Sequence, residues 1–239
     1  MSDSNVEMKR YPDAGAMARA LASEVATRLT RAAAARGNAT LVVSGGHSPV
    51  GFFEELRAQT LDWRRITVAL ADERWVEPGD LESNEHLVRA VLLSGNAAAA
   101  RFVGLKNGAP TPELGASAAW EAFAQLQRPF DVTILGMGIE GHTASLFPGS
   151  PRLVEALDPS AARGCVPMRS PTPPHERLTL NLGALLDSRH IAILILGDAK
   201  LGTYARACAA GPVEEMPVRA VLRQRRVPVE VSWAPGRSG

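Results

Sequence analysis

The chain has 239 residues, of which 46% are hydrophobic, and its formal net charge at pH 7 is +1. This length and apolar content suffice for one large core, so we expect a single α/β domain over residues 1–239. The balanced charge argues against a nucleic-acid partner, and no apolar run reaches the roughly 18 residues that span a bilayer, which argues against a membrane partner.

Residues 2–5 (SDSN) are polar where a signal sequence would be apolar, which predicts a cytoplasmic protein. Cys165 and Cys208 lie far apart without a C-x-x-C spacing, so the sequence indicates neither a zinc knuckle nor a disulfide framework. We therefore expect no metal, and a monomer is the default expectation.

Strand and helix patterns alternate from the first residues onward. Apolar residues recur every four positions from Met17 to Leu29 and predict a helix that ends near Gly37. A β-branched strand over 40–43 then runs into a glycine turn, and the apolar residues of 52–56 predict the next helix. A strand over 66–71 repeats the unit, with an N-cap at Ser83 and a helix through Leu92.

The second half continues the alternation with a short strand at 102–103, a helix over 112–126 and a strand over 130–135. Beyond a proline-rich loop at 171–174 we expect strands near 178–180, over 191–196 and over 229–233, and a helix from 197 towards Cys208. The pattern predicts an α/β fold with a mostly parallel, Rossmann-like sheet flanked by helices and a ligand site at the carboxyl ends of the strands. Polar clusters occupy those ends at 44–48, 72–74, 136–142 and 197–200.

The segment 136–148 (GMGIEGHTASLFP) has the G-x-G-x-x-G pattern of a dinucleotide-binding loop. Such a loop needs a long helix after its third glycine, and Pro148 and Pro151 leave room for about two turns. We expect His142 to begin a short helix whose dipole keeps the imidazole neutral, as a general base requires, with Glu140 orienting the ring. The alternative is that His142 only caps this helix.

The segment 44–48 (SGGHS) offers backbone N–H groups and hydroxyls at a helix N-terminus, which suit a phosphate, although it can also be only a tight turn. We interpret His47 as a turn residue. Arg177, at the start of a strand, and Lys200, at the start of a helix, are candidate phosphate partners, and surface positions are the alternative. Asp72, Glu73 and Arg74 form either part of a site or an ion pair that supports their loop.

Several catalytic motifs are missing from the sequence: there is no G-x-S-x-G, no H-E-x-x-H and no P-loop. A hydrolase built on this chain would therefore use an activated water. Four blocks carry a more specific signal, namely SGGHSP (44–49), DERWVEPGDLESN (72–84), LGMGIEGHTASLFPG (135–149) and RLTLNLGALLDSRHIAILILGDAK (177–200). Together they resemble the 6-phosphogluconolactonase family, whose α/β fold is shared with glucosamine-6-phosphate deaminase.

The resemblance implies hydrolysis of 6-phospho-D-glucono-1,5-lactone to 6-phosphogluconate, with no metal or organic cofactor. It also implies a role for each of ten positions. His142 is the general base and Glu140 orients it; Asp72 and Arg74 contact the sugar or hold the loop; the phosphate is bound by Ser44, Gly45, Gly46, Ser48, Arg177 and Lys200. The chain departs from the family at Glu140, where Asp is usual, and at His47-Ser48, which replace the commoner Ser-Thr or Thr-Thr pair.

Two rival functions are open at this stage. A deaminase related to this family carries a glutamate five residues after the histidine, where this chain has Phe147, and an apolar ring has no proton chemistry. A non-catalytic sugar-phosphate sensor would add a DNA-binding helix-turn-helix, and the residues before the first predicted strand contain one amphipathic helix. Assays of ammonia release and of lactone hydrolysis distinguish the three functions.

Overall fold

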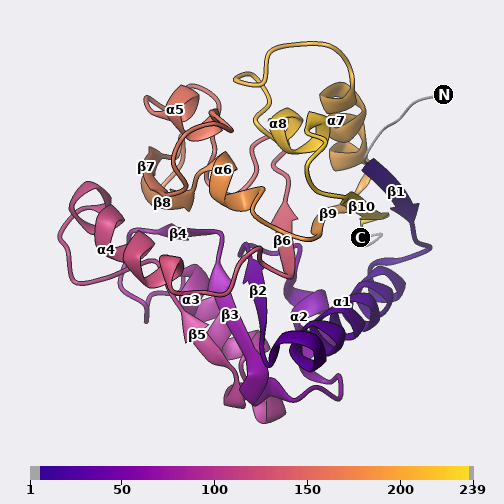
Figure 1. The fold of residues 1–239 in the computed structure, drawn as a ribbon. Helices are drawn as coiled ribbons and strands as arrows, with labels where there is room; N and C mark the ends of the chain where they lie inside the picture. The colour runs from indigo at the N-terminus through magenta and orange to yellow at the C-terminus, as the bar shows by residue number, and fades with distance from the viewer. Residues whose placement is uncertain (1–5, 237–239) are drawn as a thin grey trace.

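A central sheet of seven parallel strands organises the chain, with neighbouring strands in the order β1-β10-β9-β6-β2-β3-β5 (Figure 1). The computed structural model describes residues 6–236. The strands are β1 (Val6–Arg10), β2 (Ala39–Val43), β3 (Ile66–Leu70), β5 (Arg101–Val103), β6 (Val132–Gly136), β9 (Ile191–Leu196) and β10 (Val229–Ala234).

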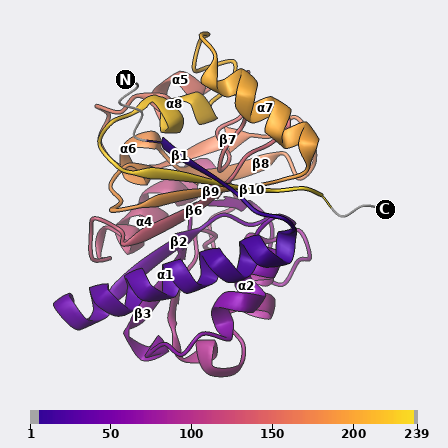
Figure 2. The same ribbon diagram turned by 90° about the vertical axis from the view of Figure 1, so that its right-hand side faces the viewer.

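Helices cover both faces of this sheet, with α1 and α2 on one side and α7 and α8 on the other (Figure 2). Strand β9 (IAILIL) is therefore almost continuously buried, as expected for a parallel strand with both faces covered. The helices are α1 (Ala14–Arg36), α2 (Val50–Arg57), α3 (Asn84–Leu87), α4 (Pro112–Ala124), α5 (Leu153–Leu157), α6 (Leu182–Leu185), α7 (Asp198–Cys208) and α8 (Val218–Arg223), with a π-helical turn over Val88–Leu92 and 3-10 turns over Trp63–Arg65 and Gly95–Ala99.

Local sequence signals set the ends of helix α1. The Asp13 carboxylate accepts a hydrogen bond from the Ala16 N–H at 2.7 Å, which caps the N-terminus. Gly37 ends the helix with a left-handed φ of 87°. Between these ends, Leu21, Val25 and the other apolar residues of one stripe are buried against the sheet. No helix within residues 6–236 is both long and apolar enough to cross a membrane.

A second, antiparallel sheet lies beside the carboxyl end of the central one, with strands in the order β4-β8-β7. Its strands are β4 (Asp72–Arg74), β7 (Cys165–Arg169) and β8 (Glu176–Leu180). The register pairs Arg74 on β4 with Arg177 on β8. This small sheet thus places two cationic residues, one from each half of the chain, on one surface.

The predicted α/β fold with its mostly parallel sheet is confirmed, as are the predicted strands and helices of the alternating units, except for the short helix expected from His142. The sequence patterns did not predict β1, β7, or the short helices α5, α6 and α8. They also treated residues 72–74 as a loop, although these residues form strand β4.

Candidate active site

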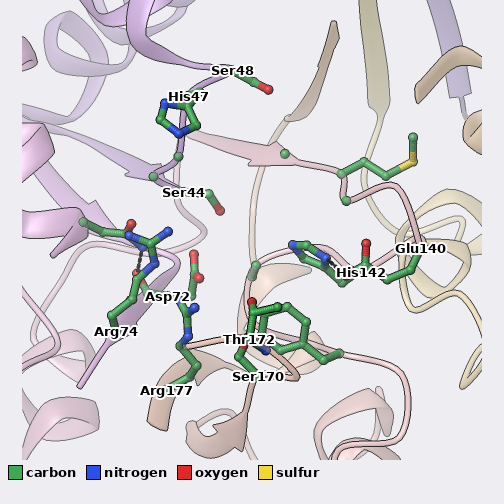
Figure 3. A pocket seen from close by; sticks show the side chains of 18 of the residues that line it. Ser44, His47, Ser48, Asp72, Arg74, Glu140, His142, Ser170, Thr172 and Arg177 are labelled. Atoms are coloured by element: carbon green, nitrogen blue, oxygen red, sulfur yellow. Dashed lines mark hydrogen bonds and ion pairs between the residues drawn. The ribbon is translucent and has the colours of Figure 1, made fainter. Parts of the chain in front are cut away.

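A cavity of about 310 Å³ opens where the segments after β2, β3 and β6 meet the start of α7 and the β7–β8 hairpin. Figure 3 shows its two walls, with Ser44, Ser48, Asp72 and Arg74 facing His142. The lining contains all ten positions to which the family resemblance assigns a role, and these are Ser44, Gly45, Gly46, Ser48, Asp72, Arg74, Glu140, His142, Arg177 and Lys200. His47 is exposed at the rim, as expected of a turn residue.

Glu140 holds the imidazole of His142. The Nδ1 atom of His142 lies 2.5 Å from Oε1 of Glu140, and Figure 3 shows the ring pointing into the cavity with Glu140 behind it. The hydrogen bond from His142 lowers the pKa of Glu140. Partial burial opposes this shift, and the charges of His142 and Lys200 add to it. An ionised Glu140 accepts a hydrogen bond from Nδ1–H of His142, which leaves the lone pair of Nε2 available as a base.

The expected helix after His142 is wrong. Thr143 and Leu146 pair in an isolated β-bridge, and the Thr143 hydroxyl donates to the Gly136 carbonyl at 2.9 Å, so the chain forms a tight turn. Ala144 within this turn has a φ of 47°, a conformation that L-residues rarely adopt. A helix dipole therefore does not set the protonation state of His142, and the hydrogen bond to Glu140 orients the ring instead.

The turn over residues 44–48 and the start of α7 form another part of the cavity lining. A side chain at Gly45 would collide with Asn84, so glycine is required for the close approach of these two loops. The Lys200 ammonium donates to the Ser48 hydroxyl at 3.1 Å, and burial lowers the pKa of Lys200. A half-buried cation beside a hydroxyl and a glycine-rich turn is a suitable partner for an anion.

Arg177 adds a second buried cation, since its side chain is only 6% exposed. Burial, followed by the charge of the neighbouring Arg74, lowers the pKa of Arg177 to about 10. Two guanidinium groups on paired strands repel each other, and a bound anion would offset that repulsion. Arg74 itself donates to the carbonyl of Glu82, which orients it along the wall.

Four buried polar atoms of the lining have no hydrogen-bond partner within residues 6–236. An unsatisfied buried donor or acceptor costs about 1–3 kcal/mol, so a cavity with several of them favours a polar ligand. The atoms are Ser44 Oγ, Asp72 Oδ1, Asn84 Oδ1 and Arg177 Nε.

The acidic residues of strand β4 have separate tasks. Asp72 accepts from the Ser145 hydroxyl at 2.6 Å through Oδ2, which ties β4 to the turn that follows His142. Glu73 is fully buried and accepts from the Ser83 hydroxyl and three backbone N–H groups, and these donors oppose the rise in its pKa that burial causes. Glu73 thus supports the loop through hydrogen bonds rather than through the internal ion pair that was one of the two alternatives for residues 72–74.

Asn84, Ser170 and Thr172 also line the cavity and were not predicted as site residues. Ser170 and Thr172 come from the β7–β8 connection and lie beside Arg177 (Figure 3). Ser170 and Thr172 flank Pro171 in the proline-rich loop. This pair of hydroxyl residues around a proline is the signal in the sequence from which they could have been predicted as site residues. Asn84 directly follows the predicted N-cap Ser83, and its position in the sequence predicts only the start of a helix.

One group of side chains in the described part of the chain has the spacing of metal ligands, and it lies away from the cavity. It consists of Glu24, His190 and Glu230, whose candidate ligand atoms lie within 4.8 Å of one another. The Lys9 ammonium already pairs with Glu24 at 2.9 Å and with Glu230 at 2.7 Å. An internal cation thus compensates the two carboxylates, and the cluster is a structural ion network.

The fold and the cavity define a class: an α/β protein whose cavity, at the carboxyl edge of a parallel sheet and beside a carboxylate–imidazole pair, is suited to an anionic ligand. Comparison with known proteins agrees. Residues 12–233 match the family described as glucosamine-6-phosphate isomerases/6-phosphogluconolactonase. The chain is 48% identical to a 6-phosphogluconolactonase of Pseudomonas aeruginosa over 96% of this chain and 95% of that protein, and 45% identical to one of Rhizobium meliloti over 97% and 100%.

A solved structure of a 6-phosphogluconolactonase from Shewanella baltica superposes with a TM-score of 0.92 at 45% identity, covering 96% of this chain and 97% of the other. The chain belongs to the glucosamine-6-phosphate isomerase/6-phosphogluconolactonase family.

Proposed function

We propose that this protein hydrolyses 6-phospho-D-glucono-1,5-lactone to 6-phosphogluconate in the oxidative pentose phosphate pathway. The observation that carries the proposal is the meeting, in one cavity of about 310 Å³, of a carboxylate-held imidazole and the two buried cations Arg177 and Lys200. Relatives that share 45–48% of its residues over nearly the whole chain are named for this activity. The cytoplasmic location and the monomeric state stay predictions from the sequence.

We assign the phosphate group of the substrate to the part of the cavity lined by residues 44–48 and Lys200, with Arg177 of strand β8 as a further cation of the lining. Lys200 and Ser48 are already within hydrogen-bond distance of each other, so a phosphate oxygen can contact both with little rearrangement. Arg177 contributes a second charge and a donor, its Nε, that has no partner within residues 6–236. Each charge-assisted hydrogen bond is worth about 1.5–3 kcal/mol.

His142 performs the proton transfers. Its Nε2 takes a proton from a water as the water oxygen attacks the C1 carbonyl carbon of the lactone, which gives a tetrahedral oxyanion and an imidazolium. The oxyanion collapses, the bond between C1 and the ring oxygen breaks, and the imidazolium returns its proton to that oxygen. The resulting carboxylic acid then loses a proton to solvent, and His142 is regenerated in its neutral form.

Glu140 stabilises the imidazolium and keeps the ring aimed at the lactone. Asp72 acts on the same turn through Ser145, so we assign to it the support of the site. We also assign to its Oδ1, which has no partner within residues 6–236, a hydrogen bond from a sugar hydroxyl. General acid–base catalysis of this kind is worth about 10² to 10⁴ in rate. An activated lactone needs no more than this help combined with positioning.

The deaminase alternative lacks a chemical group at the decisive position. Phe147 occupies the place five residues after His142, is buried, and lines the cavity. A phenyl ring accepts and donates no proton, so ring opening and isomerisation of an amino sugar have no base there.

The direct test is a lactone-hydrolysis assay coupled to 6-phosphogluconate dehydrogenase, with the spontaneous hydrolysis rate subtracted. We expect turnover well above the spontaneous rate and no ammonia release from glucosamine 6-phosphate. A rate equal to the spontaneous one would sink the proposal.

A further inference from the structure

The carbonyl group of Ile139 is held by two side chains that lie outside the cavity. Ile139 belongs to the turn between β6 and His142, and its carbonyl accepts from the Thr203 hydroxyl at 2.9 Å and from Nη2 of Arg206 at 3.1 Å. The same Nη2 donates to the Thr203 hydroxyl at 3.1 Å. The Ile139 side chain is 53% exposed, so the backbone of this residue, rather than its side chain, anchors the turn.

The other side of the same turn is also fixed through its backbone. The Gly141 carbonyl accepts from the Val218 N–H of α8 at 2.9 Å. Met216 packs so closely on Gly141 that an added Cβ would lie 2.9 Å from its side chain, and Gly141 has a left-handed φ of 89°. Glu140 therefore sits between two carbonyl groups that α7 and α8 hold in place.

Helix α7 carries the Ile139 anchor and a phosphate-binding cation together. Lys200, Thr203 and Arg206 are spaced by three residues, which places them along one side of the helix. The Lys200 charge reaches the turn as well, since it helps to lower the pKa of Glu140. Thr203 is fully buried, and its hydroxyl lies 2.9 Å from the Ile139 carbonyl and 3.2 Å from the Ala199 carbonyl of its own helix.

We propose that Thr203, assisted by Arg206, is a positioning residue that couples anion binding at Lys200 to the orientation of the Glu140–His142 pair. The inference rests on the proposed function, because it assigns Lys200 to the phosphate. An anion drawn to Lys200 fixes the first turn of α7, and the hydroxyl of Thr203 transmits that fixed position to the Ile139 carbonyl next to Glu140. Binding energy from the non-reacting phosphate is thereby used to align the reacting base.

The test measures the effect of the phosphate group on hydrolysis separately from the reaction of the lactone ring. D-glucono-1,5-lactone, which lacks the phosphate, is hydrolysed with and without added phosphite as the anion, and the phosphorylated lactone is assayed alongside. Thr203→Val keeps the volume of the side chain and removes the hydroxyl, whereas Thr203→Ser keeps the hydroxyl. Tyr204→Phe is the matched control, because it removes a hydroxyl from the adjacent residue of the same helix.

For the wild type we expect phosphite to accelerate hydrolysis of the unphosphorylated lactone. For Thr203→Val we expect kcat for the phosphorylated lactone to fall about tenfold, the size of one lost hydrogen bond, while KM and 6-phosphogluconate affinity change less than about twofold. Activation by phosphite should fall by a similar factor. Thr203→Ser should restore both values, and Tyr204→Phe should match the wild type.

The inference is overturned if Thr203→Val keeps wild-type kcat and phosphite activation, or if its loss appears in KM alone. Should Thr203→Val not fold, Arg206→Met decides the question, because Arg206 is exposed and its loss removes the second donor to Ile139. An unchanged kcat in Arg206→Met then overturns the inference. A wild-type protein that does not hydrolyse the phosphorylated lactone is a different result, since it refutes the proposed function itself.

Discussion

The phenyl ring of Phe147 packs against the imidazole of His142, with ring centroids 4.5 Å apart and planes tilted by 43°. Arg177 is a second neighbour of this phenyl ring, and its guanidinium carbon lies 5.8 Å from the ring centroid. Phe147 thus contacts both the proposed base, His142, and a buried cation.

Phe147→Leu should therefore loosen His142 without removing any proton-transfer group. We expect kcat to fall about tenfold, in line with an aromatic contact of about 0.5–1.5 kcal/mol, with a smaller change in KM. Steady-state kinetics on the phosphorylated lactone measure both values. If kcat stays at the wild-type value, Phe147 only fills space.

Arg177→Gln should weaken binding of the phosphorylated lactone. Loss of one charge-assisted hydrogen bond of about 1.5–3 kcal/mol corresponds to a rise in KM of roughly 10- to 150-fold. The unphosphorylated lactone should show little change. Because Arg177 lies against Arg74, its removal also relieves repulsion in the free protein, and we expect no fall in melting temperature. An equal loss with both lactones would contradict a phosphate role.

Glu140→Gln keeps the length of the side chain and removes its charge. The amide still contacts Nδ1 of His142 but stabilises the imidazolium less, so kcat should fall about ten- to a hundredfold with KM nearly constant. Glu140→Asp, which keeps the charge on a shorter stem, is the matched variant and should lose less. Equal kcat for Gln and Glu at this position would remove Glu140 from the mechanism.

His190 should make the folded protein sensitive to acid. Its side chain is buried, and burial, aided by the charges of Arg28 and Lys9, lowers its pKa from 6.5 to about 4 against the opposing pull of Glu24. At a pH between these two pKa values, His190 therefore binds a proton more readily in the unfolded chain than in the folded protein. The stability contributed by neutral His190 is complete above pH 6.5 and is lost as the pH falls through about 4.

Urea unfolding of His190→Phe across that range measures the effect. The free energy of unfolding should decline less steeply with acid than in the wild type, by up to about 3 kcal/mol at pH 4. Parallel curves for the two proteins would show that His190 does not titrate as its surroundings predict.

Much of the fold could be predicted because its signals are local. The four-residue apolar spacing of α1, the cap at Ser83 and the apolar run of β9 each depend on a short stretch of sequence. Strand β4 could not be found in this way, because it is short and polar and pairs with β8 across a long sequence separation. Strand β7 pairs with the nearby β8, but it is short and Pro167 interrupts its apolar pattern.

The residues of the site likewise fall into those with a local signal in the sequence and those without one. Polar residues at strand ends, such as Ser44 and His142, followed from the rule that ligands bind at the carboxyl edge of a parallel sheet. The turn after His142 was missed because Ala144 adopts a left-handed φ that no local signal of an alanine indicates. Asn84 was also missed, since its approach to Gly45 exists only once two distant loops meet.

The central claim is that His142 is the general base, and kcat of His142→Asn for the phosphorylated lactone tests it most directly. Circular dichroism and 6-phosphogluconate binding first establish that the variant folds and keeps its ligand site. We predict that kcat falls by about 10² to 10⁴ while product affinity stays within a few fold of the wild type. A variant that binds 6-phosphogluconate normally and turns over the lactone at the wild-type rate would contradict the account.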